Sequence, residues 1–209
     1  MPIITTWLEC VVRAIQRARL PIITVAATYI VSIFIGIFMV YSGNTFALDY
    51  RDQLVKQAVQ QSLISRLAAQ GNHLQAALFD FAGNLVLGAT PKALSGLAIV
   101  PPYPWIVYQG WIGGIVSVRG DHSSRLDDIR PAVYYLLTLM LQVIPYSLAI
   151  GAGVNVGVAM FRPRPYYQGD KWLTIIPVEA LRDMGWIYTI VIPLFLVASL
   201  WEFLSPWNI

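Results

Sequence analysis

The sequence predicts an all-α protein, a polytopic transmembrane helical bundle of about five spans in which prolines break some of the helices. Of its 209 residues, 57% are hydrophobic and only 12% are charged. The mean hydropathy is +0.61, and long uncharged runs alternate with short polar segments. A soluble domain of this size could not bury so much apolar surface. We therefore treat residues 1–209 as a single integral membrane domain.

Charge and cysteine content exclude several classes of function. The net charge is +3, but the basic residues form short clusters beside apolar runs, as topology determinants do, so we expect no nucleic acid partner. Cys10 is the only cysteine and cannot form an internal disulfide. No cysteine and histidine cluster, catalytic motif or phosphate loop is recognisable in the sequence, so we expect no metal, no cofactor and no enzymatic activity.

The N-terminal segment, residues 1–19, has the pattern of an interfacial helix on the cytoplasmic side. One helical face is apolar and the opposite face is polar, and the apolar face carries Trp7, Leu8, Val11, Val12 and Ile15. Three basic residues favour a cytoplasmic N-terminus by the positive-inside rule: Arg13, Arg17 and Arg19. The expected location is the cell (inner) membrane, with several passes.

The first span is predicted at Pro21–Tyr41. It offers 21 uncharged residues, or about 31 Å of helix, against a hydrocarbon core of about 30 Å. The uncharged run extends to Leu48, which is too long for a signal peptide, so the span is retained. Residues 42–73 are polar and loosely amphipathic, and we expect them to lie along the extracytoplasmic surface.

Residues 74–118 allow two interpretations that hydropathy does not separate. One has two spans joined by a tight turn at Pro91-Lys92, with the second helix broken by the Pro101, Pro102 and Pro104 cluster. The other has a single span to about Val100, followed by a re-entrant piece through the "PPYPWIVYQGWIGG" stretch.

The part of the chain after residue 118 predicts two further spans. Residues 131–161 are apolar and contain Pro145, which fits one long kinked helix or two half-helices. The run ends at "RPRP", a cytoplasmic marker. An amphipathic linker is expected at Lys171–Asp183 and the last span at Gly185–Leu204, which puts the C-terminus outside.

A small set of polar residues falls within or beside these apolar runs: His73, Asp80, Asn84 and Glu202. The first three lie on one helical face. A charge at the centre of the membrane costs about 2.5 to 3.5 kcal/mol on insertion scales, so we expect the set to face protein as a structural polar cluster. The alternative is a site for an ion or a substrate.

Two further groups of residues have a pattern that predicts structure. Small residues four apart predict close helix packing at Gly110, Gly114, Ala149, Gly153 and Gly157. Neutral polar residues near a proline predict a possible cavity, formed by Gln109, Pro145, Tyr146 and Asn155.

Four stretches, taken in order, carry a resemblance to a known family. They are "LFDFAGNLVLGA" from Leu78, "YQGWIGG" from Tyr108, "LQVIPYSLAIGAGVNVGVA" from Leu141 and "ALRDMGWIYTIVIPLFLVASLWEFLSP" from Ala180. Together they resemble the stage II sporulation protein M family of integral membrane proteins over roughly residues 19–206. The closing Glu-Phe-Leu-Ser-Pro is the most specific piece.

The resemblance implies a bundle of mostly five spans. The best-known members of that family act as membrane platforms in peptidoglycan-remodelling machinery. The chain departs from the family after the central proline, where Tyr146 and apolar residues replace the common His and Glu. The resemblance therefore gives a fold more readily than an activity.

Abundant packing residues beside few reactive ones favour a membrane scaffold or assembly subunit. It would dock other integral membrane proteins, or copies of itself, through its glycine faces, its N-terminal helix and the helix at Tyr50–Gln70. The alternative is a small ion or solute transporter or channel that uses Asp80, Asn84 and Glu202. A third hypothesis is an intramembrane hydrolase.

Overall fold

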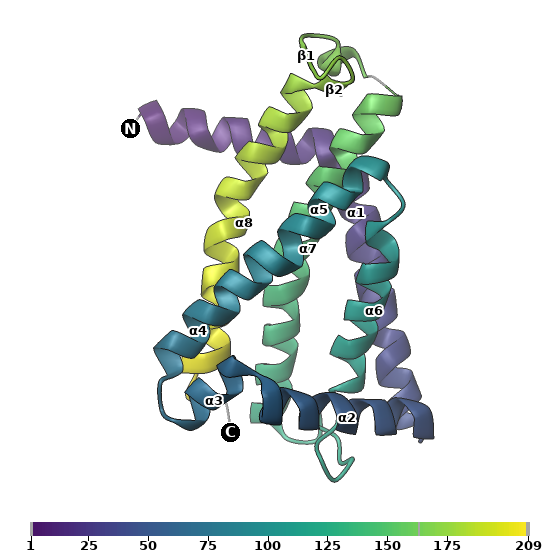
Figure 1. Ribbon diagram of the computed structural model, residues 1–209, viewed down its shortest axis with the longest axis vertical. Helices are drawn as coiled ribbons and strands as arrows, with labels where there is room; N and C mark the ends of the chain where they lie inside the picture. Colours follow the sequence, from purple (N-terminus) through teal and green to yellow (C-terminus); the bar gives the residue numbers. More distant parts are fainter. Residues whose placement is uncertain (1, 163, 208–209) are drawn as a thin grey trace.

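The computed structural model describes residues 2–162 and 164–207, which are mostly helical, so the all-α prediction is confirmed. Long helices run side by side; the first part of the longest helix lies across one end of the bundle, and two shorter helices lie across the other end (Figure 1). We name these ends the N-terminal end and the α2 end. The elements are α1 (Pro2–Tyr41), α2 (Thr45–Gln61), α3 (Leu63–Ala69), α4 (His73–Ala82), η1 (Gly83–Ala89), α5 (Thr90–Ser95), η2 (Gly96–Ala98), α6 (Pro102–Ile115), α7 (Ile129–Phe161), η3 (Pro165–Tyr167), β1 (Lys171–Trp172), β2 (Ile176–Pro177) and α8 (Val178–Leu204).

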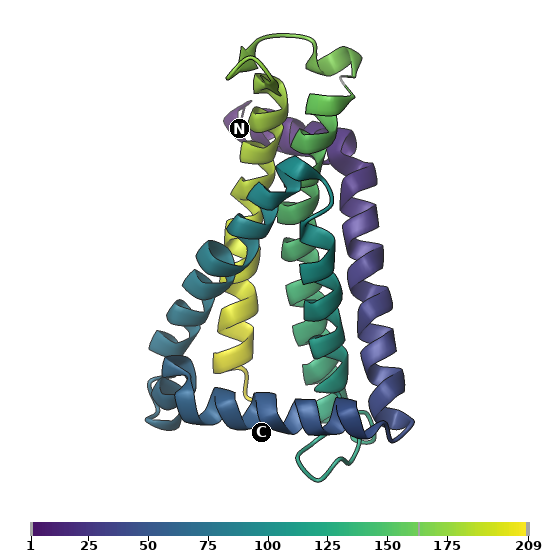
Figure 2. The same ribbon diagram turned by 45° about the vertical axis from the view of Figure 1, so that its right-hand side comes forward.

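Helix α1 combines the predicted surface helix and the predicted first span in one continuous element. Its first part lies across the N-terminal end, and the chain then turns and follows the length of the bundle (Figure 2). Pro21 lies inside the helix. A proline there lacks one backbone N–H and crowds the preceding turn, which accounts for a change of direction without an interruption.

Residues 73–98 form one oblique helical rod, built from α4, η1, α5 and η2, which follow one another without a gap. We call it the oblique helix. The turn expected at Pro91-Lys92 is wrong, because Pro91 lies in the first turn of α5. The preceding segment is a π-helix, in which the Thr90 N–H bonds Leu85 O, five residues back. This wider turn gives the proline ring room, so the helix continues.

The chain reverses after the oblique helix at residues 99–101, where Ile99 has a φ of 67°. Helix α6 then runs back towards the α2 end, beside α1 (Figure 2). Its prolines lie in or next to its first turn, where the missing N–H groups would be unpaired in any case.

Helices α7 and α8 run antiparallel and are both continuous. Of the two interpretations of residues 131–161, the structure has one long helix and not two half-helices. Pro145 lies inside α7 and Pro193 inside α8. Neighbouring helices support the chain at such positions in membrane proteins. Between the two helices a short antiparallel hairpin pairs Trp172 with Ile176. Helix α8 begins at Val178, which is earlier than the predicted Gly185.

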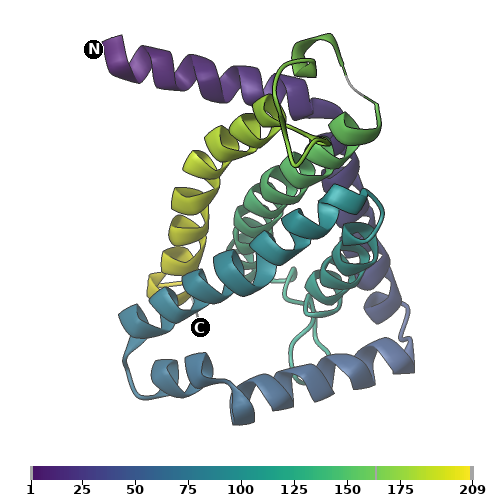
Figure 3. The same ribbon diagram turned by 45° about the horizontal axis from the view of Figure 1, so that its top comes forward.

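Helices α2 and α3 lie across the α2 end of the bundle (Figure 3). Only Ala47 and Arg51 of α2 are buried. The Arg51 side chain donates to Val118 O at 3.2 Å and to Asp52 at 2.8 Å. Hydrogen bonds from Arg51 and His122 hold the pKa of Asp52 below its usual value. These contacts fix the start of α2 to the loop that follows α6, and the rest of α2 is largely exposed.

Glycines allow backbones to touch at two helix interfaces. Between α1 and α6, a Cβ on Gly114 would overlap Ile33 O, and a Cβ on Gly110 would lie 2.6 Å from Tyr29 O. Between α7 and the oblique helix, a Cβ on Gly153 would overlap Ala93 O, and one on Gly157 would overlap Gly96 O. These glycine faces are therefore covered by helices of the same chain, as is the buried Ala149.

Three helices of the described chain are long and apolar enough to cross a membrane: Thr6–Tyr41, Ile129–Phe161 and Val178–Leu204. The largest buried cluster lies among α1, α7 and α8 and includes Tyr29, Tyr146 and Phe195. Side chains from the oblique helix reach this cluster.

Candidate functional site

Along one face of the oblique helix, every fourth position carries either a polar side chain or a glycine. These are Asp80, Asn84, Gly88 and Lys92. Residues four apart share a helical face, so the three polar side chains project in the same direction. Between them they contact three other helices: Asp80 contacts α8, Asn84 contacts α7, and Lys92 contacts α7 and α6. Together with their partners Gln109, Tyr146 and Ser199 we call them the membrane polar set.

Asp80 joins the oblique helix to α8. Its Oδ2 accepts hydrogen bonds from Ser199 Oγ at 2.7 Å and from Asn84 Nδ2 at 2.9 Å. Ser199 is fully buried and Asp80 is half-buried. The carboxylate thus faces protein, where donors compensate part of the loss of water.

Tyr146 joins α7 to the next turn of the oblique helix, at Asn84. Its hydroxyl donates to Asn84 Oδ1 at 2.8 Å, and its ring packs edge-on against Phe195 at a centroid distance of 4.9 Å. Gly88 lies opposite the hydroxyl, and a Cβ there would overlap the hydroxyl oxygen. A glycine at this position therefore makes room for the tyrosine.

Lys92 joins the oblique helix to both α7 and α6. Its Nζ lies 4.9 Å from the centre of the Tyr146 ring and donates to Gln109 Oε1. A cation over an aromatic face is attracted by the ring quadrupole. The ammonium therefore has two neutral partners from separate helices.

Glu202 lies close to this set, near the end of α8. It is half-buried, interacts electrostatically with Asp80 and accepts a side-chain hydrogen bond from Gln142 of α7. Its backbone oxygen accepts from Tyr134 at 2.8 Å, and Trp201 donates to Thr138 at 3.1 Å. The end of α8 is thereby tied to α7 at several points.

The sequence-predicted polar cluster is thus only partly assembled. Asp80 and Asn84 are in contact and Glu202 is near, but His73 lies apart. It is exposed at the start of α4, and within residues 2–162 and 164–207 its side chain has no hydrogen bond or ion pair. The α4 helix has just begun there, beyond the packed part of the rod.

The residues of the expected cavity also separate. Gln109 and Tyr146 meet at Lys92, and Pro145 is buried beside Tyr146 in α7. Asn155 lies more than two turns further along α7, where its Nδ2 donates to Tyr167 at 2.8 Å. The four side chains therefore do not line one space.

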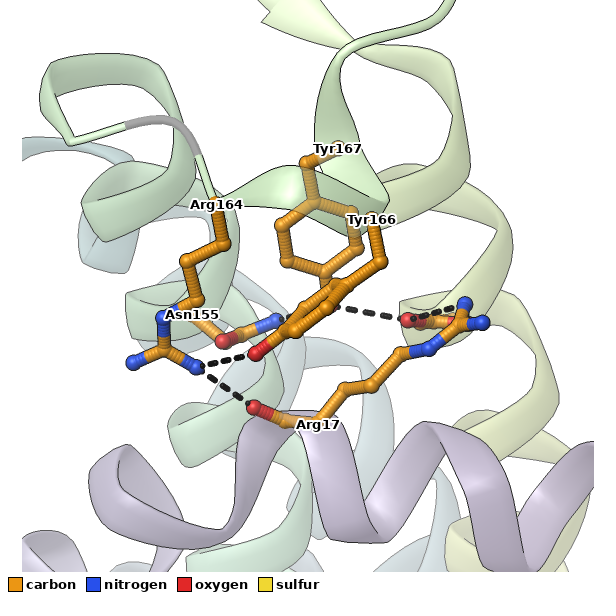
Figure 4. Close-up of polar contacts among 6 residues, drawn as sticks. Arg17, Asn155, Arg164, Tyr166 and Tyr167 are labelled. Atoms are coloured by element: carbon orange, nitrogen blue, oxygen red, sulfur yellow. Dashed lines mark hydrogen bonds and ion pairs between the residues drawn. The ribbon is translucent and has the colours of Figure 1, made fainter.

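Asn155 belongs instead to a second polar cluster at the N-terminal end, shown in Figure 4. The buried Tyr167 hydroxyl donates to Asp183 Oδ2 at 2.8 Å, and Asp183 pairs with Arg17 at 3.3 Å. Arg164 Nη1 donates to Arg17 O and to the Tyr166 hydroxyl, both at 2.8 Å. Burial raises the pKa of Tyr167 above its usual value.

Sequence reasoning missed several members of both clusters. Lys92 was assigned to a turn, although its spacing from Asp80 and Asn84 was a usable signal once the helix was known to continue. Ser199 and Gln142 had no local signal, because their partners are distant in the sequence. Arg17 and Arg164 have the pattern of topology markers, and nothing in the sequence indicates their contacts with Asp183 and Tyr166.

The chemistry available to the membrane polar set is hydrogen bonding and charge compensation. Among the described residues, no group of three or more His, Cys, Asp or Glu side chains could hold a metal ion. The set contains two carboxylates if Glu202 is counted, one ammonium, two amides, one phenol and one hydroxyl. Such groups can fasten helices or pass protons.

The chain matches no model of a known protein family, no curated protein and no solved structure.

Proposed function

We propose that the chain is a polytopic scaffold or assembly subunit of the cell inner membrane, similar to the stage II sporulation protein M family. In this proposal the chain crosses the membrane five times, through α1, the oblique helix, α6, α7 and α8. The basic residues of the N-terminal end favour its location in the cytoplasm, and the C-terminus is then outside. The proposal assigns no catalytic activity and no cofactor.

One observation carries the proposal. The ionisable side chains within the bundle bond partners on other helices: Asp80 bonds Ser199, Lys92 bonds Gln109 and Glu202 bonds Gln142. Such pairs fix helices relative to one another in lipid. They support one defined arrangement of the helices, which a docking platform requires.

The surfaces that remain for partner proteins are the two segments that lie across the ends of the bundle. The glycine faces pack inside the chain itself, so we no longer assign them to docking. The far part of α2 and the start of α3 expose apolar side chains, with Val59 64% and Leu63 54% accessible. We assign α2 and α3, together with the first part of α1, to contacts with other integral membrane proteins.

A photo-crosslinking residue at Val59 tests this assignment in cells. We expect a discrete adduct of defined mass that survives purification in mild detergent. The matched control is the same residue at Leu87, a 78% exposed position on the oblique helix, where no discrete adduct is expected. A monodisperse protein without adducts from Val59, or identical adducts from both positions, would count against the proposal.

A second candidate function is transport of protons or small ions. The observation that favours it is the series of polar contacts from Asp80 through Asn84 and Tyr146 to Lys92, with a second carboxylate, Glu202, near Asp80. Asp80 and Lys92 are twelve residues apart in the oblique helix, so the series extends for at most about 18 Å along the helix axis.

Flux into proteoliposomes tests the transport candidate. Transport would give a wild-type flux above that of empty vesicles, and a reduction of at least about tenfold in Asp80→Asn and Glu202→Gln, since each removes a charge from the series. The exposed Asp49→Asn serves as a control without effect. Wild-type flux equal to that of empty vesicles across protons and common ions would end this candidate and leave the scaffold proposal standing.

A further inference from the structure

The N-terminal end carries a positively charged pocket of about 410 Å³, between the bend of α1 and the segment that follows α7. Its lining includes four arginines and no carboxylate: Arg13, Arg17, Arg19 and Arg164. Like charges crowded into one recess repel each other unless an anion lies among them. The pocket therefore favours a negatively charged ligand.

Only part of this charge is compensated by the protein. Arg13 pairs with Glu9 at 3.1 Å and Arg17 with Asp183 at 3.3 Å. Arg164 donates to two neutral oxygens, the Arg17 backbone carbonyl and the Tyr166 hydroxyl. Arg19 makes no ion pair within the described residues. Four arginines against two carboxylates leave two positive charges for a ligand.

The pocket is also preorganised. Arg164 is held between the backbone of α1 and the Tyr166 hydroxyl, and the Arg17 guanidinium lies 5.3 Å from the centre of the Tyr166 ring (Figure 4). Arg17 is further fixed by the buried Asp183. Guanidinium groups held in place lose less entropy when they bind a phosphate in bidentate fashion.

An apolar groove continues from the charged pocket along the flank of the bundle. It measures about 230 Å³ and is lined by Pro21, Ile99, Tyr103, Val154 and Val158, among others. The two spaces share Leu20 and Arg164 in their linings. A charged recess at the end of membrane-crossing helices, joined to an apolar groove, is complementary to an amphiphile with a charged headgroup and an apolar chain.

We infer that this is a binding site for an anionic phospholipid, with the headgroup phosphate on Arg19 and Arg164 and one acyl chain in the apolar groove. Basic pockets between membrane helices bind such headgroups on the cytoplasmic side, where the charge distribution also puts this end. A free phosphate would use the charged pocket alone, whereas a phospholipid uses both spaces. The inference shares with the scaffold proposal only the placement of this end on the cytoplasmic side.

Native mass spectrometry of the full chain in detergent tests the site. Dioleoyl phosphatidylglycerol and dioleoyl phosphatidylcholine have the same chains and differ in headgroup charge. We expect the anionic lipid to bind at least about tenfold more tightly, and the Arg19→Gln/Arg164→Gln variant to lose that preference. Inorganic phosphate and glycerol 1-phosphate, the headgroup alone, should compete only weakly.

The matched control is Arg66→Gln/Arg130→Gln, which removes two exposed arginines elsewhere in the chain and should keep the preference. An unchanged melting temperature shows that each variant is folded. Equal binding of the two lipids, or equal loss in both double variants, would overturn the site. Competition by inorganic phosphate at the same concentration as the lipid would reassign the pocket to free phosphate and overturn the lipid inference.

Discussion

The Gly153→Leu variant is expected to lose about 3 kcal/mol of stability, because a side chain there must push α7 away from the oblique helix. The obstacle is the Ala93 backbone carbonyl, which cannot move aside as a side chain can. For a chain of this length the melting temperature should fall by roughly 6 to 12 °C. A thermal unfolding assay in detergent, read by size-exclusion chromatography, measures the effect.

Gly185→Leu is the matched control. Gly185 is exposed in α8, and a Cβ there would meet nothing within 4 Å. Its stability should stay within about 0.5 kcal/mol of the wild type. Equal losses in the two variants would show that leucine in a membrane helix, and not the contact with Ala93, causes the effect.

The Tyr146→Ala variant is expected to lose about 3 to 5 kcal/mol, as large aromatic truncations in a core do. The ring packs against Phe195 and Tyr29, and it also lies beneath the Lys92 ammonium. Tyr146→Phe keeps the ring and removes only the hydroxyl that bonds Asn84, so it should lose about 1 kcal/mol. The same unfolding assay separates the two losses.

Phe38→Ala provides the comparison for an aromatic side chain outside the core. Phe38 is 73% exposed on α1 and should change stability by no more than about 0.5 kcal/mol. If Tyr146→Phe alone caused the full loss seen in Tyr146→Ala, the hydroxyl and not the packing of the ring would dominate at this position.

The sequence was sufficient for the class of the protein and for its longest helices. The class follows from composition, because the total apolar surface of the chain does not depend on how its helices pack. The apolar run at residues 131–161 predicted α7 to within two residues of its start, and Leu204 was placed correctly as the end of α8. Helices of this kind are local features, visible in a window of about twenty residues.

What failed depended on neighbours that are distant in the sequence. Pro91 ends no helix, because a π turn precedes it and the following turn packs against α7, where Ala93 O meets Gly153. The partners of Asp80 and Asn84 come from α8 and α7, more than sixty residues away. Periodicity shows which face a residue occupies but not which helix lies opposite.

Helix contacts made by backbone atoms at glycines and helix contacts made by polar side chains differ in how easily they deform. Where α1 meets α6, backbone touches backbone at Gly114, and a separation of about one ångström would remove up to about half of the van der Waals attraction at this contact. Where the first half of the oblique helix meets α7 and α8, polar side chains span the distance and can follow a small rotation. A change in lateral pressure or thickness of the bilayer would therefore change the tilt of this half of the oblique helix before it separates α1 from α6.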